Sequence, residues 1–340
     1  MDANVAGGAG TIHDKSVFDA IRAIVGTYPD VRVFNFSFAA SHPLASYGSV
    51  HRRERMITAQ DLDNFIFEND VVIAVAAGNS PSGLAPNPPY PDHVDDPNWK
   101  LGHWASGFNT VVCGSCVGTL TVNGIVKTLG WPSPFTRIGP GIADAPVPGF
   151  CANGGNRNEM HGFEPGLGVW VSNNDGIWED HAGTSFAVPL LARQAAFAFQ
   201  ELQSYCQQDT RPFGATVKAF LAMTATKRYD DSALSTSVSE LCNRTLGRGC
   251  ASADRLREPS SRSAIYIWQG VLDAPSDTAL IQCPIPQDWY NKAAQPMLRV
   301  ILAADVPVNE AIHDLWACRE LFLRVRTNAD EHALSPLRTI

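Results

Sequence analysis

The N-terminal part of the chain alternates between helical and strand-like hydrophobic patterns. Apolar residues at helical spacing predict helices over residues 15–25, 58–68, 183–203 and 215–226. Short runs rich in β-branched and apolar residues predict strands over residues 31–38, 71–77, 110–117 and 168–171. The continuous apolar run VVIAVAA at 71–77 suits the centre of a parallel sheet that is covered on both faces. The predicted fold class is therefore α/β, a parallel sheet with helices on both faces.

The pattern changes in the C-terminal part of the chain. Residues 229–263 are rich in Ser, Arg and Asp, and we expect an irregular segment that closes the first domain. Beyond it, strand-like runs at 264–272, 278–283, 297–303 and 319–326 are separated by Pro, Asn and Asp, with few helical signals between them. This order predicts a small all-β, sandwich-like module. The expected domains are residues 1–262 and 263–340.

Composition and charge exclude several classes of protein. The chain has 340 residues, of which 45% are hydrophobic, so it can bury a sizeable core and is not intrinsically disordered. Its formal net charge of −8 argues against nucleic acid as a partner. No apolar run approaches the length of a membrane span, and the first residues lack the features of a signal peptide. We therefore expect a cytoplasmic protein without membrane contact.

Eight cysteines are consistent with reduced thiols in that compartment. Cys113 and Cys116 have the CxxC spacing that occurs in zinc and redox sites. No second CxxC follows, and the pair lies inside a predicted strand. Two buried strand thiols are the favoured interpretation, and we predict no metal site from this pair.

Ser185 opens the predicted helix 183–203. Free N–H groups and the helix dipole favour negative charge at such a position, which helps an oxyanion on a substrate that the serine attacks. Gly183 allows close approach of a backbone, and Pro189 cannot donate to the carbonyl of Ser185. An ordinary N-cap formed by Thr184 or Ser185 is the alternative interpretation.

Asn79 follows the buried strand 71–77, where ligand-binding groups of open α/β sheets lie. Its amide is able to donate to an oxyanion. A Gly-Asn turn is the simpler explanation when this pair is considered alone.

Together these segments resemble the subtilisin-like serine proteases, the subtilases. GTSFAVP at 183–189 is similar to the nucleophile motif of that family, and AVAAGN at 74–79 is similar to its oxyanion strand. VFNFSFA at 33–39 resembles the strand that lines the substrate cleft, and FTRIGP at 135–140 resembles a further loop motif. The four motifs occur in family order over about residues 1–260.

The resemblance implies roles for individual residues. Ser185 matches the nucleophile, and Asn79 matches the oxyanion donor. The expected walls of the substrate groove, along which family members bind peptide as an extended strand, are Ser37, Phe38 and Ala39 on one side and Ala76, Ala77 and Gly78 on the other. Gly183, Thr184 and Pro189 belong to the nucleophile loop.

The resemblance is incomplete, because the family motifs D-[ST]-G and H-G-T-x-V-A, which carry the catalytic Asp and His, do not occur in this sequence. His181 lies four residues before Ser185 and is expected to orient the loop rather than to act as the base. Without a base a serine is a weak nucleophile, so the chain alone should be nearly inactive. Three explanations are open: the missing residues precede this sequence, a second polypeptide supplies them, or the chain is a pseudoprotease that binds peptides. The presence of both Ser185 and Asn79 favours the first two.

The predicted function is peptide-bond hydrolysis by Ser185, with a peptide or protein as substrate and no required cofactor. LRVILAADVPVN at 298–309 resembles a segment of intracellular subtilases that accompany an AAA ATPase, which implies such a partner. The acidic residues of 92–96 offer a calcium site, although an ordinary acidic surface is the favoured explanation.

Overall fold

The computed structural model describes residues 13–206, 210–230, 234–253, 265–272, 279, 281 and 300–308. Its centre is a parallel sheet in the order β1-β2-β3-β4, formed by Val33–Phe36, Val72–Ala76, Val111–Cys116 and Phe150–Asn153. The register pairs Val33 with Val72, Ala74 with Val111 and Cys113 with Phe150. All four strands run the same way, so their carboxyl ends meet at one edge of the sheet.

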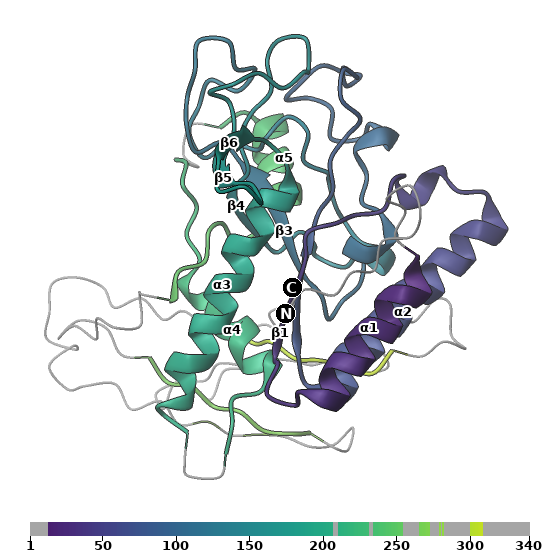
Figure 1. The fold of residues 1–340 in the computed structure, drawn as a ribbon, viewed down its shortest axis with the longest axis vertical. Coiled ribbons are helices and arrows are strands. Elements are labelled where there is room, and N and C mark those ends of the chain that lie inside the picture. Colours follow the sequence, from purple (N-terminus) through teal and green to yellow (C-terminus); the bar gives the residue numbers. More distant parts are fainter. Residues whose placement is uncertain are drawn as a thin grey trace, which may run out of the picture.

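Helices cover both faces of this sheet, as Figure 1 shows. Helices α1 (Asp14–Thr27) and α2 (Ser49–Asn69) pack on one face, where Ile21 and Ile66 meet the β2 side chains Ile73 and Val75. Helix α3 (Thr184–Gln203) packs on the other face with α4 (Gly214–Thr224) beside it. The buried side of α3 is largely alanine, and these small side chains let the helix lie close to β2, β3 and β4.

The alternation of side chains along β2 explains why the whole strand is apolar. Val72, Ala74 and Ala76 face the α3 side, and Ile73 and Val75 face the α1–α2 side. Both sets are fully buried, which requires an uninterrupted hydrophobic run. The α/β prediction is confirmed, and the predicted helices and the first three strands correspond to α1 to α4 and β1 to β3.

The fourth strand of the sheet differs from the prediction. The strand predicted at 168–171 is present as β5 (Val169–Ser172), but it pairs antiparallel with β6 (Trp178–His181) in a separate hairpin rather than in the parallel sheet. The fourth sheet strand is β4, whose residues FCAN lead directly into two glycines. Its shortness and the adjoining polar and glycine residues hide it from a search for hydrophobic runs.

The expectation of an irregular segment over 229–263 was wrong in part. Helix α5 (Thr236–Leu246) lies within it and begins at Ser235, whose hydroxyl accepts a hydrogen bond from the Val238 N–H. Val238, Leu241, Cys242 and Leu246 repeat at helical spacing and are buried. Val238, Cys242 and Leu246 pack against β3 and β4, and Leu241 packs against Trp99 and Ile138. The many polar residues of α5 lie on its exposed side and conceal this pattern.

The predicted C-terminal all-β module lies mostly outside the described residues. Its described pieces, 265–272 and 300–308, contain no regular strand. They contact the α/β domain: the Asn109 side chain donates to the Val306 carbonyl and accepts from its N–H, and Lys218 pairs with Asp305. The two-domain division stays a prediction. In the described part of the chain, no helix is long and apolar enough to cross a membrane.

Candidate active site at the carboxyl edge of the sheet

Ser185 lies in the first turn of α3, beside the carboxyl end of β2. The serine is half-buried, whereas its neighbours Gly183 and Thr184 are buried. Among the described residues, no side chain hydrogen-bonds the Ser185 hydroxyl. The Ser185 N–H belongs to the first turn, where no preceding carbonyl of the helix is available as partner. The hydroxyl and this N–H are therefore both free for a bound molecule.

Helix α3 continues through Pro189, which is exposed on its outer side. A proline has no N–H, so the carbonyl of Ser185 lacks the usual partner four residues further along. The proline thus loosens the hydrogen bonding of the helix where the serine lies, as the sequence predicts.

Asn79 is held against the start of α3 by Thr184. The Asn79 Oδ1 accepts a hydrogen bond from the Thr184 N–H at 2.9 Å and from the Thr184 hydroxyl at 3.0 Å. Because a backbone N–H donates only, the oxygen of the carboxamide must face Thr184 and the Nδ2 must face away. Within the described residues this NH₂ group has no hydrogen-bond acceptor. Thr184 therefore leaves the Asn79 NH₂ as an open donor at the nucleophile loop, where a Cβ on Gly183 would lie 3.1 Å from the Nδ2.

Gly78 joins this unit to β2. Its N–H donates to the Thr184 hydroxyl at 3.1 Å, and its φ of +97° is a conformation that favours glycine. A Cβ at this position would lie 3.0 Å from the Arg137 Cδ and 3.1 Å from the Ala39 Cβ. A larger residue would therefore disturb both the turn and its support.

Two buried arginines brace the segment on either side of Asn79. Arg137, 2% exposed, donates to the carbonyls of Ala40 and Ser41, and its own N–H donates to the Gly78 carbonyl. Arg157 donates to the hydroxyl and carbonyl of Ser80 and stacks over the Phe135 ring. Burial lowers the pKa of each guanidinium to about 10, which leaves both charged at neutral pH.

Arg137 belongs to the FTRIGP motif, but the sequence analysis did not find Arg157. Its signal is a single charged residue among the small and polar residues of CANGGNRN, directly after β4. The same stretch holds the nucleophile loop, because the Gly154 carbonyl accepts a hydrogen bond from the Gly183 N–H at 2.8 Å. A Cβ on Gly154 would lie 2.7 Å from the Gly183 carbonyl oxygen, so this contact requires glycine.

The structure brings the expected groove residues to the same edge of the sheet but places their side chains differently. Ala76 and Ala77 are fully buried, which leaves only their backbone for contact with a peptide. Phe38 stacks on Phe36 and packs edge-on against Trp104. The Ser37 hydroxyl accepts a hydrogen bond from the side chain of the exposed Asn35. Ser37, Phe38 and Ala39 follow β1 directly, so they adjoin the Gly78 turn.

His181 ends β6, immediately before the nucleophile loop. Its Nε2 lies 2.9 Å from a carboxylate oxygen of Glu179, and this hydrogen bond lowers the pKa of Glu179. The imidazole also stacks on the ring of Phe186. The ring is thus held by Glu179 and Phe186, and its loop-orienting role stays a prediction.

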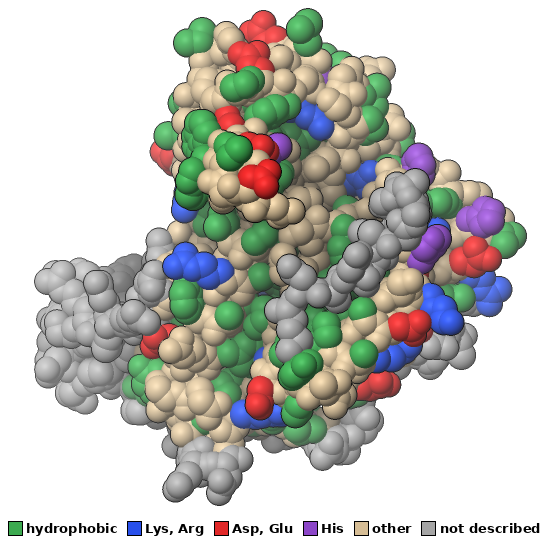
Figure 2. Space-filling view, in the orientation of Figure 1, with side chains coloured by type: hydrophobic (Ala, Val, Ile, Leu, Met, Phe, Trp, Pro, Cys, Tyr) green, Lys and Arg blue, Asp and Glu red, His purple; other side chains and the backbone are tan. Residues whose placement is uncertain are grey.

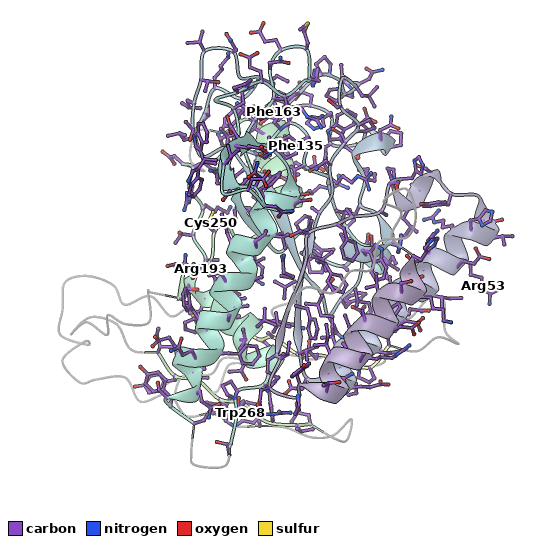
Figure 3. The ribbon with its side chains drawn as sticks, viewed as in Figure 1. Arg53, Phe135, Phe163, Arg193, Cys250 and Trp268 are labelled. Atoms are coloured by element: carbon purple, nitrogen blue, oxygen red, sulfur yellow. The ribbon has the colours of Figure 1, made fainter. Side chains whose placement is uncertain are left out.

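The surface beside the loop is formed by the β5–β6 hairpin. Figure 2 shows acidic and hydrophobic side chains gathered on this end of the molecule. The exposed residues of the hairpin include Trp170, Ile177, Trp178 and Glu179. Figure 3 places Phe163 at this end of the molecule, where its ring stacks at 6.4 Å on that of His181. The hairpin and the loop of Phe163 together hold the His181 ring.

The acidic segment 92–96 does not form a cluster of metal ligands. Asp96 caps a short helical turn by accepting from the Asn98 N–H, and it also accepts from the Asn87 N–H. Asp95 is exposed and lies 3.4 Å from both Lys100 and Arg244. Over the described ranges, no three acidic or histidine side chains converge here as metal ligands do.

The parallel α/β sheet, the open serine at the start of α3 and the carboxamide held near it form the arrangement that the resemblance to subtilases predicts. The model of the subtilase family matches residues 3–248, and the chain belongs to that family.

Individual proteins are also similar to this chain, at low sequence identity. The chain is 26% identical over 300 residues to the uncharacterized protein y4bN of Sinorhizobium fredii, a match that covers 79% of this chain and 66% of that protein. It thus spans slightly less than two thirds of that relative. The prenylagaramide maturation protease PagA is similar with a TM-score of 0.46 and 16% identity, over 76% of this chain and 70% of PagA. A lanthipeptide protease is similar with a TM-score of 0.47 and 18% identity, over 73% and 66%.

Proposed function

We propose that this chain carries the nucleophile and the oxyanion site of a serine endopeptidase. The observation that carries the proposal is the Asn79–Thr184 pair, which leaves the Asn79 NH₂ as an open donor at the loop whose Ser185 hydroxyl has no partner among the described residues. In an acyl transfer the Ser185 Oγ attacks the peptide carbonyl carbon and the hydroxyl loses its proton. The carbonyl oxygen becomes an oxyanion, which accepts hydrogen bonds from the Asn79 amide and the Ser185 N–H.

The surroundings of Asn79 support this role through rigidity. A catalytic donor is effective when it is already oriented towards the charge that develops in the transition state. Thr184, Gly78, Arg137 and Arg157 fix the Asn79 backbone and its Oδ1 before any substrate arrives. The segment after β1 and the Gly78 turn then offer backbone edges on which an extended peptide can lie, which extends the proposal to Ser37, Phe38, Ala39, Ala76 and Ala77.

The proposal also includes the source of the base. Ser185 needs a histidine to accept its proton and an aspartate to orient that histidine. The corresponding family motifs are missing from these 340 residues, and His181 is engaged by Glu179. We infer that a polypeptide segment outside this sequence supplies the pair. In the described sheet β1 is an edge strand, which pairs with β2 alone and offers its other edge to such a segment.

Peptide hydrolysis tests the proposal. The 340-residue chain is assayed on a fluorogenic peptide mixture alone, and then together with a polypeptide that carries the two missing motifs, with Ser185→Ala as control. Expected are negligible turnover for the chain alone and turnover in the assembly that Ser185→Ala abolishes. A stable assembly that binds peptides without cleaving them would overturn the protease proposal and favour the alternative, a pseudoprotease that binds or regulates through the same groove.

A further inference from the structure

Three cysteines from distant parts of the chain meet on the face of the sheet that α5 covers. Cys116 ends β3, Cys151 lies in β4, and Cys250 follows α5 in a bridge with Thr226. Their Sγ atoms all lie within 4.8 Å of one another, and the Cys151 and Cys250 sulfurs are 3.6 Å apart. All three are free thiols, and Cys116 and Cys151 are buried. The cluster thus joins β3 and β4 to the segment after α5, which also contacts β4 through the hydrogen bond from the Cys151 N–H to the Gly249 carbonyl.

The spacing of the sulfurs matches the dimensions of a thiolate metal site. A zinc ion with Zn–S bonds of about 2.3 Å in tetrahedral geometry separates its sulfurs by about 3.8 Å. The Cys151–Cys250 distance is close to that value, and the 4.8 Å limit on the other pairs requires only small side-chain shifts. A disulfide, by contrast, joins two sulfurs at about 2.05 Å and leaves the third thiol unused.

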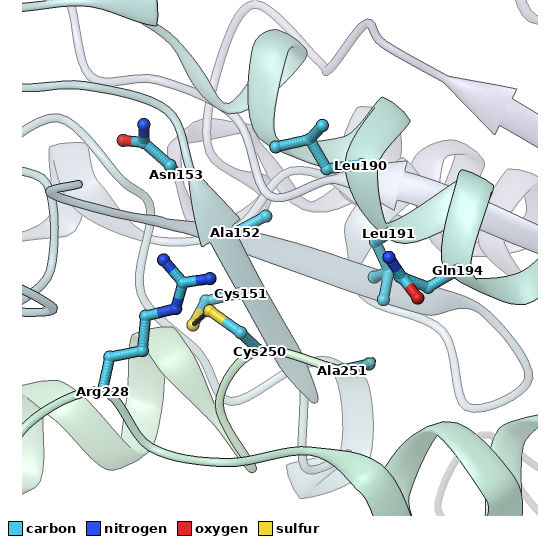
Figure 4. Close-up of a pocket in the computed structure, with 9 residues that line it drawn as sticks. All are labelled: Cys151, Ala152, Asn153, Leu190, Leu191, Gln194, Arg228, Cys250 and Ala251. Atoms are coloured by element: carbon cyan, nitrogen blue, oxygen red, sulfur yellow. Dashed lines mark hydrogen bonds between the residues drawn. The ribbon is translucent and has the colours of Figure 1, made fainter. Parts of the chain in front are cut away.

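A cavity of about 160 Å³ adjoins the cysteines, and Figure 4 shows the residues that line it. Cys151 and Cys250 form one part of its wall, and Asn153, Gln194 and Arg228 supply polar groups. This volume and these partners suit a water molecule, which is the usual fourth ligand of zinc when the protein provides three.

A positive charge lies beside the cluster, because Arg228 lines the same cavity as Cys151 and Cys250. Metal ligation requires thiolates, and Arg228 offsets the net negative charge that three thiolates leave on a divalent ion.

We propose that Cys116, Cys151 and Cys250 bind one Zn²⁺ ion, whose fourth position faces the cavity beside Arg228. The site joins β3, β4 and the segment after α5. Cys151 lies three residues before Gly154, whose carbonyl holds the Gly183 N–H. The metal would therefore brace the strand that supports the nucleophile loop, and its role is structural. CxxC spacing did not reveal it, because Cys113 faces the α3 side of the sheet and only Cys116 reaches the cluster.

Metal binding to the reduced full chain tests the proposal. The metal-free protein is titrated with Zn²⁺ and, in parallel, with Co²⁺, whose thiolate charge-transfer absorption reports sulfur ligation directly. Expected are one ion per chain, a higher Tm with zinc, and protection of three thiols from a thiol reagent. Cys151→Ser and Cys250→Ser should each weaken zinc binding at least tenfold. Cys206→Ser, which alters a cysteine outside the cluster, should bind zinc like the parent.

Several outcomes would overturn the site. Absence of stoichiometric zinc binding by the parent chain would do so, and so would binding of Cu⁺ but not Zn²⁺. A Cys151–Cys250 disulfide found by mass spectrometry in protein that does not bind zinc would equally contradict it. Cys242→Ala tests packing separately, since Cys242 lies in the same hydrophobic cluster but is not one of the three thiols. This variant should lose stability and still bind one zinc ion. Peptide hydrolysis enters none of these measurements, so failure of the zinc site leaves the proposed protease function untouched.

Discussion

The carboxamide oxygen of Asn79 accepts hydrogen bonds from both the backbone N–H and the hydroxyl of Thr184, at 2.9 and 3.0 Å. The same hydroxyl accepts from the Gly78 N–H, so Thr184 connects the end of β2 to the start of α3. One buried threonine thereby sets the direction in which the Asn79 amide donates. The chemistry proposed for Ser185 depends on this connection.

Thr184→Val tests the connection, because valine keeps the shape of threonine and removes its hydroxyl. The buried Gly78 N–H loses its acceptor, which should lower the free energy of unfolding by about 1–2 kcal/mol. In the active assembly, kcat should fall about tenfold with little change in KM, since the Asn79 amide is less firmly oriented. Thr184→Ser keeps the hydroxyl and should retain most of the activity. An unchanged kcat in Thr184→Val would contradict the positioning role.

Asn79→Ala removes the donor itself and should lower kcat about 10²–10³-fold, the range for loss of one oxyanion donor. The variant should bind peptide substrates as the parent does, because the interaction is made only in the transition state. Steady-state kinetics of the assembly measure both parameters. A rise in KM with kcat preserved would show that Asn79 binds the substrate rather than the oxyanion.

Gly78→Ala places a methyl group in a left-handed turn and 3.0 Å from the Arg137 Cδ. Strain and the required shift of Arg137 should cost about 1–3 kcal/mol of stability. Gly26→Ala is the matched control, since Gly26 lies near the end of α1 with no atom within 4 Å of the added methyl group. Helix propensity predicts that Gly26→Ala is neutral or stabilising. Equal denaturation midpoints for the two variants would refute the strained turn.

Arg137→Met should destabilise the fold by about 2–4 kcal/mol. Methionine fills much of the space but leaves the Ala40 and Ser41 carbonyls without their buried donors. Arg53→Met, at an exposed position of α2 that Figure 3 labels, should change stability by less than about 0.5 kcal/mol. Urea denaturation of the three proteins measures the difference, and a stability of Arg137→Met equal to that of Arg53→Met would argue against the bracing role.

Stability should depend on pH through His93. Burial lowers the pKa of this imidazole to about 4, against 6.5 in its ordinary state, and the ring packs between Tyr90 and Trp99. Below pH 6.5 the unfolded chain takes up a proton that the folded chain refuses until about pH 4. The free energy of unfolding therefore falls through this window, by roughly 3 kcal/mol at most.

His93→Phe removes this titration while it retains an aromatic ring. The difference in stability between parent and variant should shift in favour of the variant as the pH falls from 7 to 4. Denaturation curves at several pH values give this difference directly, and other titrating groups cancel in the comparison. A difference that is constant with pH would mean that His93 titrates normally in the folded protein.

The sequence predicted those parts of the fold whose hydrophobic pattern is strong. Strand β2 and helix α3 were found because one is continuously apolar and the other carries its apolar residues on one face. Strand β4 and helix α5 were missed, since the first is four residues long beside glycines and the second is amphipathic within a polar stretch. Patterns that depend on tertiary contacts are weak in a short window of sequence.

The candidate site was likewise predictable in part. Ser185 and Asn79 follow from their places at a helix start and a strand end, together with the family motifs. Arg157 and the pairing of Asn79 with Thr184 depend on segments 77 and 105 residues apart that only the fold brings together. The cysteine cluster is a stronger example, because a strand places Cys113 and Cys116 on opposite faces and makes the CxxC spacing misleading.

The central claim, that Ser185 is the nucleophile, is tested most directly by the position of a covalent adduct. The assembly that contains the chain and the missing acid–base pair is treated with a fluorophosphonate, digested, and analysed by mass spectrometry. The account predicts a single adduct on Ser185, formed only when the pair is present and absent from Ser185→Ala. An adduct on any other residue, or none in an assembly that hydrolyses peptides, would contradict it.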